Sequence, residues 1–371
     1  MILGLLPALG GGLGELATTG QVGRLLDGYI ARYLAVFDRV RYFSYLVETL
    51  GDFTRDPVLL ERVDLIAPRQ RISRGRRAAT LAWTESHYLR SCAVLRVFQV
   101  TGTVPALAAR ARFGVPYVTT YGFSYAELSQ PGPKRVLKAA VERLGLRRAA
   151  AVIATTEALR ARAARVAREV HLVPNGVDTR RFAPPPGGRP PRRPARILYV
   201  GRFAPEKNLE ALVTAAATLR RWLPVQLVMV GAGALQPMLR ERARAAGVDV
   251  EFPGVVPQER LPPFYAAADA FVLASFTEGH PKVLLEAMAS AVPCVASSCE
   301  GNRSLVTDGV TGLLFDPRRP EELADRLASV LTDPALAATL GQAGRAMVVE
   351  RYDLHTLVGT EIALLRRVAA V

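Results

Sequence analysis

The sequence predicts an α/β protein with two facing Rossmann-like domains, each built on a parallel sheet. Three observations lead to this prediction. Short apolar runs alternate with longer helical stretches along the whole chain, which is typical of βαβ units. A segment dense in Pro, Gly and Arg, 178–195, interrupts the pattern near the middle and is expected to be a linker. The length of 371 residues is enough for two domains of ordinary size.

The first domain is expected over residues 1–177. Helical periodicity covers stretches such as 21–36 and 133–148. The start of the chain is interpreted as a first strand followed by a glycine loop, rather than as a signal peptide, because it lacks a basic segment before the apolar run. The strand candidates are apolar runs bounded by turn signals, at 2–6, 39–46, 93–100, 116–121, 150–155 and 169–174.

The second domain is expected over residues 196–354. The last stretch, 355–371, has helical periodicity and is expected to cross back onto the first domain. In open parallel sheets, ligands bind beyond the carboxyl ends of the strands, so two facing domains predict a site in the cleft between them. The strand candidates of the second domain lie at 196–201, 225–231, 248–254, 270–275 and 293–298.

Charge is distributed unevenly along the chain, which has a formal net charge of +15. Residues 1–193 hold 30 Arg and Lys against 14 Asp and Glu, whereas residues 194–371 hold 18 against 19. This asymmetry indicates an anionic partner or surface for the first domain. Arg-rich codon usage is the alternative, since the chain has 44 Arg and only four Lys.

The cysteines and the apolar runs indicate the compartment. Three cysteines form an odd set without the spacing of metal ligands, which argues for a reducing environment. No apolar run reaches the ~18 residues of a transmembrane helix. We therefore expect a cytoplasmic protein.

Residues 199–213, YVGRFAPEKNLEALV, contain a junction suited to anion binding. A buried strand is expected to end at Gly201, and a helix follows shortly after it. Free N–H groups at a helix N-terminus attract anions, and the charges of Arg202 and Lys207 add to that attraction. A solvated loop with ordinary surface charges is the alternative. Two of the four lysines, Lys207 and Lys282, fall at such junctions in the second domain, which favours an anion site.

The stretch TEGHPKVLLEAM, residues 277–288, places two carboxylates in apolar surroundings. Glu286 lies within a predicted buried helix, and Glu278 lies eight positions earlier, in the loop before it. Glu is rarely buried without a partner. An ionised carboxylate accepts several hydrogen bonds, so the hydroxyls of a sugar and a ribose would suit these residues. The alternative is an i,i+4 pair of Lys282 and Glu286 on a solvent-exposed face.

Other classes of site are disfavoured by the sequence. MVGAGALQ, residues 229–236, comes close to the dinucleotide fingerprint, but Gln236 replaces its third glycine, which argues against a nicotinamide or flavin enzyme. The sequence contains no Asp-x-Asp pair, no cluster among its four histidines and no Gly-x-Ser-x-Gly elbow. A metal site of obvious spacing is therefore not expected.

Several of these segments resemble the motifs of the family-4 glycosyltransferases, which have the GT-B fold. The similarity is closest over about residues 170–316. The resemblance implies a metal-independent hexosyltransferase that retains configuration, moving a sugar from a nucleotide-diphosphate sugar to an acceptor hydroxyl. No cofactor is implied, a UDP-sugar is expected rather than a GDP-sugar, and the acceptor is a glycan, a lipid or a small molecule. The matching segments are VPNGVDTRRF (interdomain motif), VGRFAPEKN (phosphate-binding loop), EGHPKVLLEAMASAVPCVAS (two-glutamate signature) and DGVTGLLF (the turn that follows).

By motif position, the resemblance assigns roles to individual residues. Glu286 is expected to accept hydrogen bonds from the donor ribose. The catalytic residues are expected to be Glu278, which contacts hydroxyls of the transferred sugar, and Arg202 and Lys207, which hold the diphosphate. Further donor-binding residues are expected at Gly201, Gly279, His280, Lys282 and Val283. The acceptor side or the diphosphate loop is expected to include Gly11, Gly12, Tyr121 and Asn175.

Tyr121 departs from the pattern of the family. Many members carry a His in a stretch reading roughly Val-Thr-x-His-Gly, where this chain reads VTTYGFSY. Tyr, with a free pKa near ~10, is a poor base at neutral pH, although it can donate or relay a hydrogen bond.

Two alternatives to a glycosyltransferase are weighed against the sequence. A nucleotide-sugar epimerase or a phosphorylase of the same fold would use similar residues. A basic nucleic-acid-binding protein would explain the charge of the first domain, but the sequence lacks a recognisable motif or a pattern of stacking aromatics, so no nucleic-acid partner is expected.

Residues 131–150, PGPKRVLKAAVERLGLRRAA, have the pattern of a basic amphipathic helix. They carry six basic residues, and Leu137, Val141 and Leu144 recur at helical spacing on one side. RQRISRGRR, residues 69–77, adds five arginines. Such a helix can lie on an anionic bilayer, so peripheral docking on the cytoplasmic face of a membrane is expected. The alternative is that the apolar stripe packs into the first domain.

Overall fold

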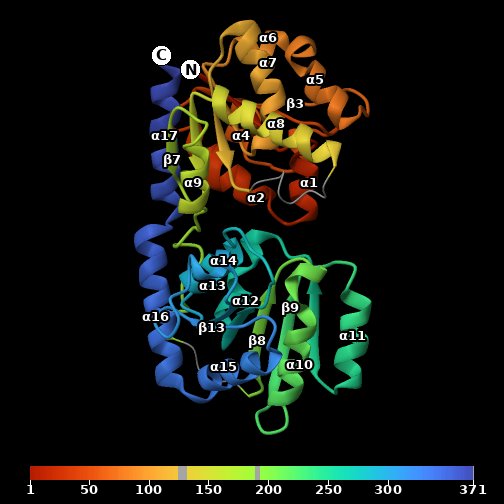
Figure 1. The fold of residues 1–371 in the computed structure, drawn as a ribbon, viewed down its shortest axis with the longest axis vertical. Coiled ribbons are helices and arrows are strands. Elements are labelled where there is room, and N and C mark those ends of the chain that lie inside the picture. Colours follow the sequence, from red (N-terminus) through yellow and green to blue (C-terminus); the bar gives the residue numbers. More distant parts are fainter. Residues whose placement is uncertain (124–131, 189–192, 371) are drawn as a thin grey trace. The chain divides into compact units, whose positions relative to one another are not determined.

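The computed structural model describes residues 1–123, 132–188 and 193–370, and the chain forms two compact units (Figure 1). Unit 1 consists of Met1–Pro174 and Thr356–Val371, and unit 2 of Asn175–His355. The segment 178–195 falls within unit 2, where Phe182 is buried in the core; its residues 189–192 lie outside the described residues. None of the described helices combines the length and the apolar character that crossing a membrane requires.

Unit 1 is built on a seven-stranded sheet of order β3-β2-β1-β4-β5-β6-β7, in which all neighbouring strands pair in parallel. Six of the seven lie within the runs that the sequence predicts. The strands are β1 (Ile2–Leu6), β2 (Arg39–Phe43), β3 (Val63–Ile66), β4 (Val94–Val97), β5 (Tyr117–Tyr121), β6 (Ala151–Ala154) and β7 (Val170–Leu172).

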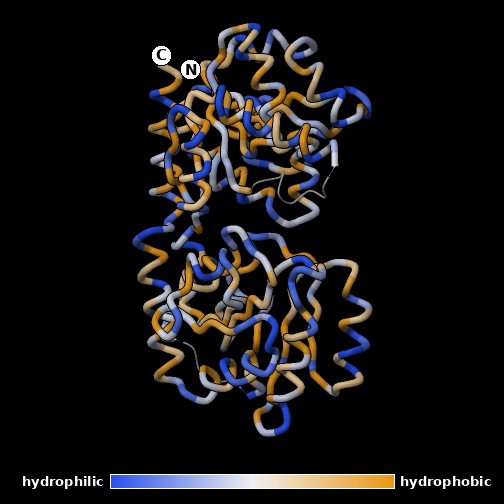
Figure 2. Tube along the Cα trace, viewed as in Figure 1, coloured by the Kyte–Doolittle hydropathy of each residue, from blue (hydrophilic) through white to orange (hydrophobic). Residues whose placement is uncertain are grey.

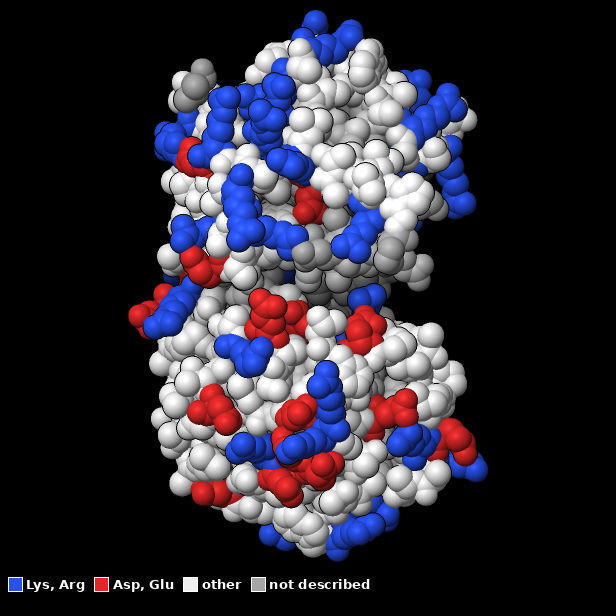
Figure 3. Space-filling view, in the orientation of Figure 1, with Lys and Arg blue, Asp and Glu red and all other residues white. Residues whose placement is uncertain are grey.

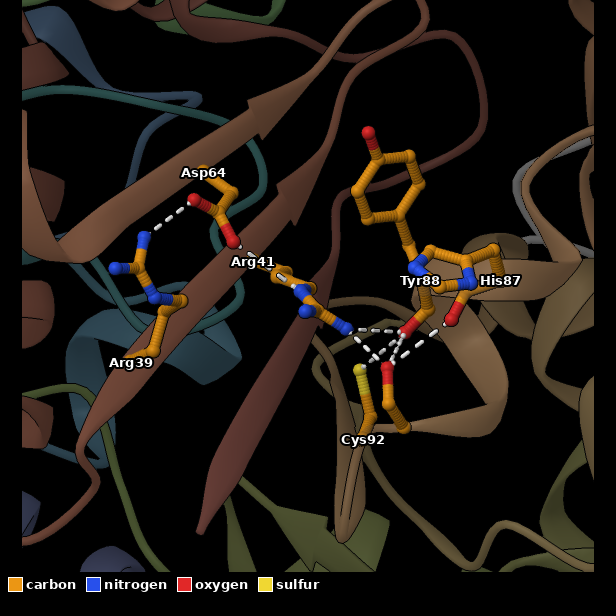
Figure 4. A network of polar contacts seen from close by, with 7 residues as sticks. Arg39, Arg41, Asp64, His87, Tyr88 and Cys92 are labelled. Carbon is orange, nitrogen blue, oxygen red and sulfur yellow. Dashed lines mark hydrogen bonds and ion pairs between the residues drawn. The ribbon is translucent and has the colours of Figure 1, made fainter.

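The sequence does not predict β3, because Asp64 interrupts its short apolar run. Figure 4 shows how the charge is accommodated by the neighbouring strand β2. Asp64 Oδ1 accepts a hydrogen bond from Arg39 Nη1 at 2.6 Å, and Oδ2 accepts one from Arg41 Nε at 3.2 Å. Arg41 also donates to the carbonyl of Tyr88 at 2.8 Å. The two arginines therefore compensate the negative charge of Asp64 at the β2–β3 edge of the sheet.

Helices connect the strands of unit 1, as parallel strands require. The predicted helix at 133–148 is confirmed by α8, whereas the one at 21–36 is divided into three short pieces that end at Tyr33. Its middle piece is a π-helix that contains Gly28, a poor α-helix former. The helices are α1 (Leu13–Thr18), α2 (Val22–Leu25), η1 (Leu26–Ile30), α3 (Ala31–Tyr33), η2 (Leu50–Asp52), α4 (Pro57–Arg62), α5 (Arg74–Thr84), α6 (Ser86–Arg90), η3 (Val100–Gly102), α7 (Thr103–Phe113), α8 (Pro133–Arg148), α9 (Glu157–Ala163) and α17 (Leu354–Ala369).

Unit 2 is built on a six-stranded parallel sheet of order β10-β9-β8-β11-β12-β13. Five strands agree with the predicted runs to within a residue at their starts, and β13 was not predicted because it spans only three residues. The strands are β8 (Ala195–Val200), β9 (Val225–Val230), β10 (Asp249–Gly254), β11 (Ala270–Leu273), β12 (Cys294–Ser297) and β13 (Leu313–Phe315).

Helices connect the strands of unit 2, and α11 buries one face and exposes the other. Along α11, orange and blue residues alternate in Figure 2, and Leu239 and Ala243, one turn apart, are its buried positions. The helices are η4 (Pro205–Lys207), α10 (Leu209–Leu219), α11 (Gln236–Ala245), η5 (Gln258–Arg260), α12 (Pro262–Ala266), α13 (Lys282–Ala289), α14 (Glu300–Arg303), α15 (Pro320–Thr332) and α16 (Pro334–Arg351).

A buried ion pair attaches the C-terminal helix α17 to the sheet of unit 1. Arg96 on β4 donates from Nε to Glu361 Oε1 at 2.7 Å and from Nη2 to Oε2 at 3.0 Å. The Tyr33 hydroxyl donates to the same carboxylate. Burial, followed by the negative charge of Glu361, raises the pKa of Tyr33. All of the charge on Glu361 is therefore balanced inside unit 1.

Candidate functional site

The candidate residues of unit 2 gather at the carboxyl edge of its sheet. The loops after β8 and β11, which are neighbouring strands, are joined there by a hydrogen bond from the Phe276 N–H to the Glu206 carbonyl at 2.9 Å. Lys207 ends η4 in the first loop and Glu278 lies in the second. Lys207 Nζ approaches Glu278 Oε1 to 2.7 Å, and the two side chains are 15% and 12% exposed. The structure thus brings together two predicted site residues that lie far apart in the sequence.

The carboxylate of Glu278 is bonded through one oxygen. Oε1 accepts from Lys207 Nζ and also from the Ser275 hydroxyl at 2.6 Å. Among the residues that the structure describes, none donates a hydrogen bond to Oε2. Sequence reasoning missed Ser275, whose only signal was its place just after a buried strand. The second oxygen of Glu278 is left to accept a hydrogen bond from a ligand.

Arg202 lies in the same loop as Lys207 but makes different contacts. Its guanidinium is largely exposed and pairs with Glu206, with Nη2 and Oε1 3.1 Å apart. Its carbonyl accepts a hydrogen bond from the Tyr199 hydroxyl at 2.9 Å, which fixes the backbone of the loop. Gly201, just before it, has a φ of +156°, a conformation that favours glycine. Arg202 is therefore near the end of β8 as predicted, but no described contact joins it to Glu278.

Glu286 is buried inside unit 2, with only 1% of the residue exposed. Its Oε1 accepts from Gln258 Nε2 at 3.0 Å and its Oε2 from the Tyr265 hydroxyl at 2.9 Å. The alternative of a pair with Lys282 on a solvent face is therefore wrong, because the carboxylate does not reach the surface. Gln258 and Tyr265 were not singled out from the sequence; Gln258 carried a signal, as a polar residue in the short loop after β10.

His280 is a buried neutral imidazole at the start of the two-glutamate helix. Burial, and then the charge of Lys282, lowers its pKa from 6.5 to about 4. Its Nδ1 is buried and has no hydrogen-bond partner among the described residues. Its carbonyl accepts from Asn175 Nδ2 at 3.0 Å, so Asn175 contacts the backbone of this loop within unit 2.

The remaining donor-side candidates surround His280 in the sequence. Gly279 precedes it and is half-buried, and Lys282 and Val283 form the first turn of α13, also half-buried. The Val283 carbonyl accepts a hydrogen bond from the Tyr265 hydroxyl at 3.3 Å. The loop before α13 and its first turn are therefore held by side chains from two other segments, at Asn175 and Tyr265.

An open pocket of about 620 Å³ is lined by sequence neighbours of Gln258 and Tyr265, the two partners of Glu286. It is formed by the loop after β10 and by α12, and its walls include Val255, Pro257, Glu259 and Phe264. Gln258, which donates to Glu286, lies between two of these wall residues in the sequence. Apolar walls with a few polar groups at the carboxyl edge of a parallel sheet are typical of a ligand pocket.

In unit 1, the predicted glycine loop is occupied by a carboxylate of the same chain. Glu48 accepts hydrogen bonds from the N–H groups of Leu13, at 2.9 Å, and Gly14, at 2.7 Å. A Cβ on Gly12 would lie only 2.8 Å from Glu48 Oε1, so glycine is needed there for this approach. The Gly11 carbonyl accepts a hydrogen bond from the N–H of Tyr45, in the loop after β2. A role of Gly11 and Gly12 near a diphosphate stays a prediction.

Tyr121 is buried at the end of β5 in unit 1. Its hydroxyl donates to Glu142 Oε1 on α8 at 2.9 Å. The phenol therefore has a partner inside its own unit, which favours a positioning role over proton transfer. Over the described part of the chain, no group of three or more His, Cys, Asp or Glu side chains is placed to hold a metal ion.

Comparison with known families explains this arrangement. Residues 186–347 match the family described as Glycosyl transferases group 1, and residues 58–181 match Glycosyltransferase Family 4. The chain belongs to the family-4 glycosyltransferases. The first match contains every candidate residue of the unit 2 site except Asn175.

The curated relatives of this family-4 chain match only part of their own length. The GDP-mannose-dependent alpha-(1-6)-phosphatidylinositol monomannoside mannosyltransferase of Mycobacterium tuberculosis is 34% identical over 54% of this chain and 56% of the relative. The glycogen synthase of Mycobacterium tuberculosis is 35% identical over 51% of this chain and 46% of the relative. The chain thus spans about half the length of the curated relatives it matches.

Solved structures confirm the predicted fold class. Sucrose-phosphate synthase from Thermosynechococcus elongatus matches 100% of this chain and 99% of its own, with a TM-score of 0.79 and 24% identity. HepE from Anabaena, solved with UDP and glucose, matches 98% of this chain and 99% of its own, with a TM-score of 0.76 and 19% identity. The family-4 chain therefore has the GT-B fold, with two Rossmann-like parallel sheets.

Proposed function

We propose that the protein is a retaining glycosyltransferase that moves a hexose from a nucleotide-diphosphate sugar to an acceptor hydroxyl. The observation that carries the proposal is the pair of Lys207 and Glu278 at the carboxyl edge of β8 and β11. The ammonium group of Lys207 has donors left for an anion, and Oε2 of Glu278 is left for a hydroxyl. A nucleotide sugar carries both groups close together.

The chemistry follows from how charge develops as the glycosidic bond breaks. Positive charge grows on the sugar and negative charge on the departing diphosphate. Lys207, with Arg202 from the same loop, would stabilise that diphosphate more strongly in the transition state than in the ground state. The acceptor hydroxyl would lose its proton to the departing phosphate, on the same face of the sugar, so a strong protein base is not required.

The nucleoside would occupy the surroundings of Glu286. The buried carboxylate is oriented by Gln258 and Tyr265, and the sequence neighbours of these two residues line the pocket formed by the loop after β10 and α12. We propose that the ribose hydroxyls bind toward Glu286 and that Gln258 rearranges to admit them. His280 remains uncharged at neutral pH and, with Gly279, Lys282 and Val283, would line the diphosphate side.

The donor is proposed to be a UDP-sugar, and neither a metal nor a cofactor is required. The mannosyltransferase relative is named as GDP-mannose-dependent, whereas HepE was solved with UDP, so both nucleotides belong in the test. The acceptor is proposed to be a glycan, a lipid or a small molecule with a free hydroxyl.

The test begins with thermal unfolding in a panel of nucleoside diphosphates and their sugars. A ligand that binds only the folded state raises the unfolding temperature. Turnover of the stabilising sugar donor is then followed with and without acceptor, phosphate and EDTA. Transfer that needs an acceptor and survives EDTA supports the proposal. Turnover without acceptor would indicate an epimerase, phosphate dependence would indicate a phosphorylase, and loss restored only by a divalent ion would refute metal independence.

We also propose that unit 1 docks on an anionic membrane through α8, on the cytoplasmic face. Val136 and Leu137 are 71% and 66% exposed, and Leu144 is also exposed. The alternative that this stripe packs into the first domain is therefore wrong for Leu137 and Leu144, whereas Val141 is half-buried. Arg135, Lys138, Arg143, Arg147 and Arg148 surround it; Pro131 and the side chain of Lys134 lie outside the described residues.

The charge of unit 1 supports the same proposal. On the face drawn in Figure 3, blue side chains are spread over unit 1 with few red ones, whereas unit 2 carries both. Each basic residue near an anionic bilayer contributes on the order of 1 kcal/mol. Co-sedimentation with anionic vesicles at low salt, and release at high salt, is the expected result. Binding that does not prefer anionic to neutral vesicles, or that survives Leu137→Ser unchanged, would refute it.

A further inference from the structure

Glu278 stands at the end of a chain of buried hydrogen bonds that extends away from the proposed ligand. The Ser275 hydroxyl donates to Glu278 Oε1 at 2.6 Å. The Ser297 hydroxyl donates to the Ser275 carbonyl at 2.5 Å, and Asn302 Nδ2 donates to the Ser297 hydroxyl at 2.9 Å. Ser275, Ser297 and Asn302 are all fully buried. The chain connects the ends of β11 and β12 with α14.

The direction of this chain is fixed by its chemistry. Asn302 Nδ2 also contacts the Ser297 carbonyl, at 2.9 Å. A carbonyl only accepts, so the nitrogen of the Asn302 amide must face Ser297. The Ser297 hydroxyl then accepts from Asn302 and gives its own proton to the Ser275 carbonyl. The Ser275 hydroxyl has a single proton, and its contact with an ionised carboxylate uses that proton.

The backbone beneath Glu278 is held as closely as its side chain. A Cβ on Gly301 would lie 2.4 Å from the Glu278 carbonyl oxygen, so α14 packs directly against that peptide. The residue that follows, Asn302, holds the hydrogen-bond chain. The loop of Glu278 and the end of β12 therefore share α14 as a support, and rotation about the terminal bond of the Glu278 side chain remains possible.

That rotation decides which oxygen faces the ligand. The terminal torsion of Glu is broad and has no strong intrinsic preference. Lys207 alone could be bound by either oxygen, or by both at once, which would leave less acceptor capacity for a sugar. With Ser275 and Lys207 both on Oε1, the carboxylate is held with Oε2 free of described partners.

We propose that Ser275 is a positioning residue for Glu278, supported by Ser297 and Asn302, and that its role is to present Oε2 to a hydroxyl of the transferred sugar. The inference rests on the proposed function, in which Glu278 contacts that sugar. A hydrogen bond to a charged group is stronger than one between neutral groups, so the loss of one is measurable.

The kinetic test compares Ser275→Ala with wild type. We expect kcat/KM for the sugar donor to fall about tenfold or more, which is the scale of one hydrogen bond to a charged group. Affinity for UDP or GDP without a sugar should stay unchanged, because Oε2 contacts only the sugar. Ser297→Ala should also lower kcat/KM, by a smaller factor, and leave the affinity for UDP or GDP unchanged. It replaces Ser275→Ala in the test if that variant does not fold. Ser329→Ala, which removes an exposed hydroxyl on α15, is the matched control and should leave both quantities unchanged.

The structural test does not depend on turnover. Crystal structures of wild type and of Ser275→Ala, both without ligand, should differ in the rotation of the Glu278 carboxylate, with Oε1 no longer held in one place. An unrotated carboxylate in Ser275→Ala would overturn the inference, as would a rotated carboxylate with unchanged kcat/KM. If wild type turns over no nucleotide sugar, the proposed function fails, and the crystal structures still decide whether Ser275 positions Glu278.

Discussion

Two ion pairs, one in each unit, differ in how completely their atoms are bonded. In unit 1, Arg96 meets Glu361 through two contacts, and both carboxylate oxygens are used. Arg96 Nη1 also donates to the Val97 carbonyl at 2.7 Å, and Tyr33 donates to Glu361. In unit 2, Lys207 and Glu278 share one contact, and one carboxylate oxygen is free of described partners.

The surroundings of the two pairs differ in the same way. The side chains of Arg96 and Glu361 are 4% and 5% exposed, whereas those of Lys207 and Glu278 are 15% and 12% exposed. A buried pair with every atom bonded holds two elements together and has nothing left to offer a ligand. A pair with unused donors and acceptors that is also reachable from solvent can bind one. The comparison thus separates a structural ion pair from a candidate catalytic one.

The largest effect is expected from Glu361→Ala. Removing one partner leaves the charge of Arg96 buried without compensation, which costs about 3–5 kcal/mol. The free energy of unfolding of unit 1 should fall by that amount. Trp83 lies in unit 1 and Trp222 in unit 2, so denaturant unfolding in a Trp222→Phe background reports on unit 1 alone. Glu157→Ala, which breaks an exposed pair with Arg160 on α9 of the same unit, is the control. A loss below about 1 kcal/mol, the range of surface pairs, would contradict the structural role.

The next effect concerns activity rather than stability. Lys207→Ala and Arg202→Ala should each lower kcat/KM roughly 100-fold, the scale for losing one preorganised contact to a developing anion. The free energy of unfolding should change little for Arg202→Ala, whose head group is largely exposed. Arg242→Ala, which breaks an exposed pair with Glu210 on the same unit, should leave kcat/KM unchanged. Near-full activity in both Lys207→Ala and Arg202→Ala would mean that the diphosphate binds elsewhere on the protein.

A smaller effect is expected from pH, through His280. Its pKa is about 4 in the folded protein and near 6.5 when exposed, so between these values the unfolded chain binds a proton that the folded chain does not. The free energy of unfolding of unit 2 should therefore fall as pH falls, by about 2 kcal/mol from pH 7 to pH 5. His280→Asn should remove this component, as reported by Trp222 fluorescence in unit 2. The same pH dependence in wild type and in His280→Asn would contradict the assignment.

The smallest effect is expected from Tyr121→Phe. The hydroxyl donates to the carboxylate of Glu142 within unit 1, as the Tyr33 hydroxyl does to Glu361, so its loss should cost about 1.5 kcal/mol of stability. Activity should remain within a few-fold of wild type. If kcat fell by orders of magnitude in a folded variant, the phenol would take part in the chemistry, and the comparison between the units would no longer hold.

Most of the fold was predictable because it depends on local patterns. Buried parallel strands are continuous apolar runs, and the ends of those runs placed Lys207 and Glu278 at the same edge of one sheet. β3 and β13 were missed because a charge interrupts the first and the second is too short to show a pattern. Both segments become strands by pairing with a neighbour, β3 with β2 and β13 with β12, and that pairing cannot be read from the segment itself.

The partners of the site residues were not predictable, since they come from distant segments. Glu286 was expected to await a ligand, yet Gln258 and Tyr265 already bind it, and no spacing in the sequence links them. Ser275 looked like the ordinary end of a strand. The exposure of Leu137 on α8 also depends on what packs nearby, which periodicity alone does not reveal.

The most direct test of the central claim is calorimetric titration of UDP and GDP into wild type, Lys207→Ala and Glu278→Ala. In this account, Lys207 and Glu278 bind different parts of the sugar donor. Lys207 binds the diphosphate, and Glu278 binds the sugar. Lys207→Ala should therefore lose affinity for the nucleoside diphosphate by about tenfold or more, the scale of a hydrogen bond to a charged group. Glu278→Ala should bind it as well as wild type while losing turnover of the sugar donor. Equal affinity in wild type and Lys207→Ala would contradict the account.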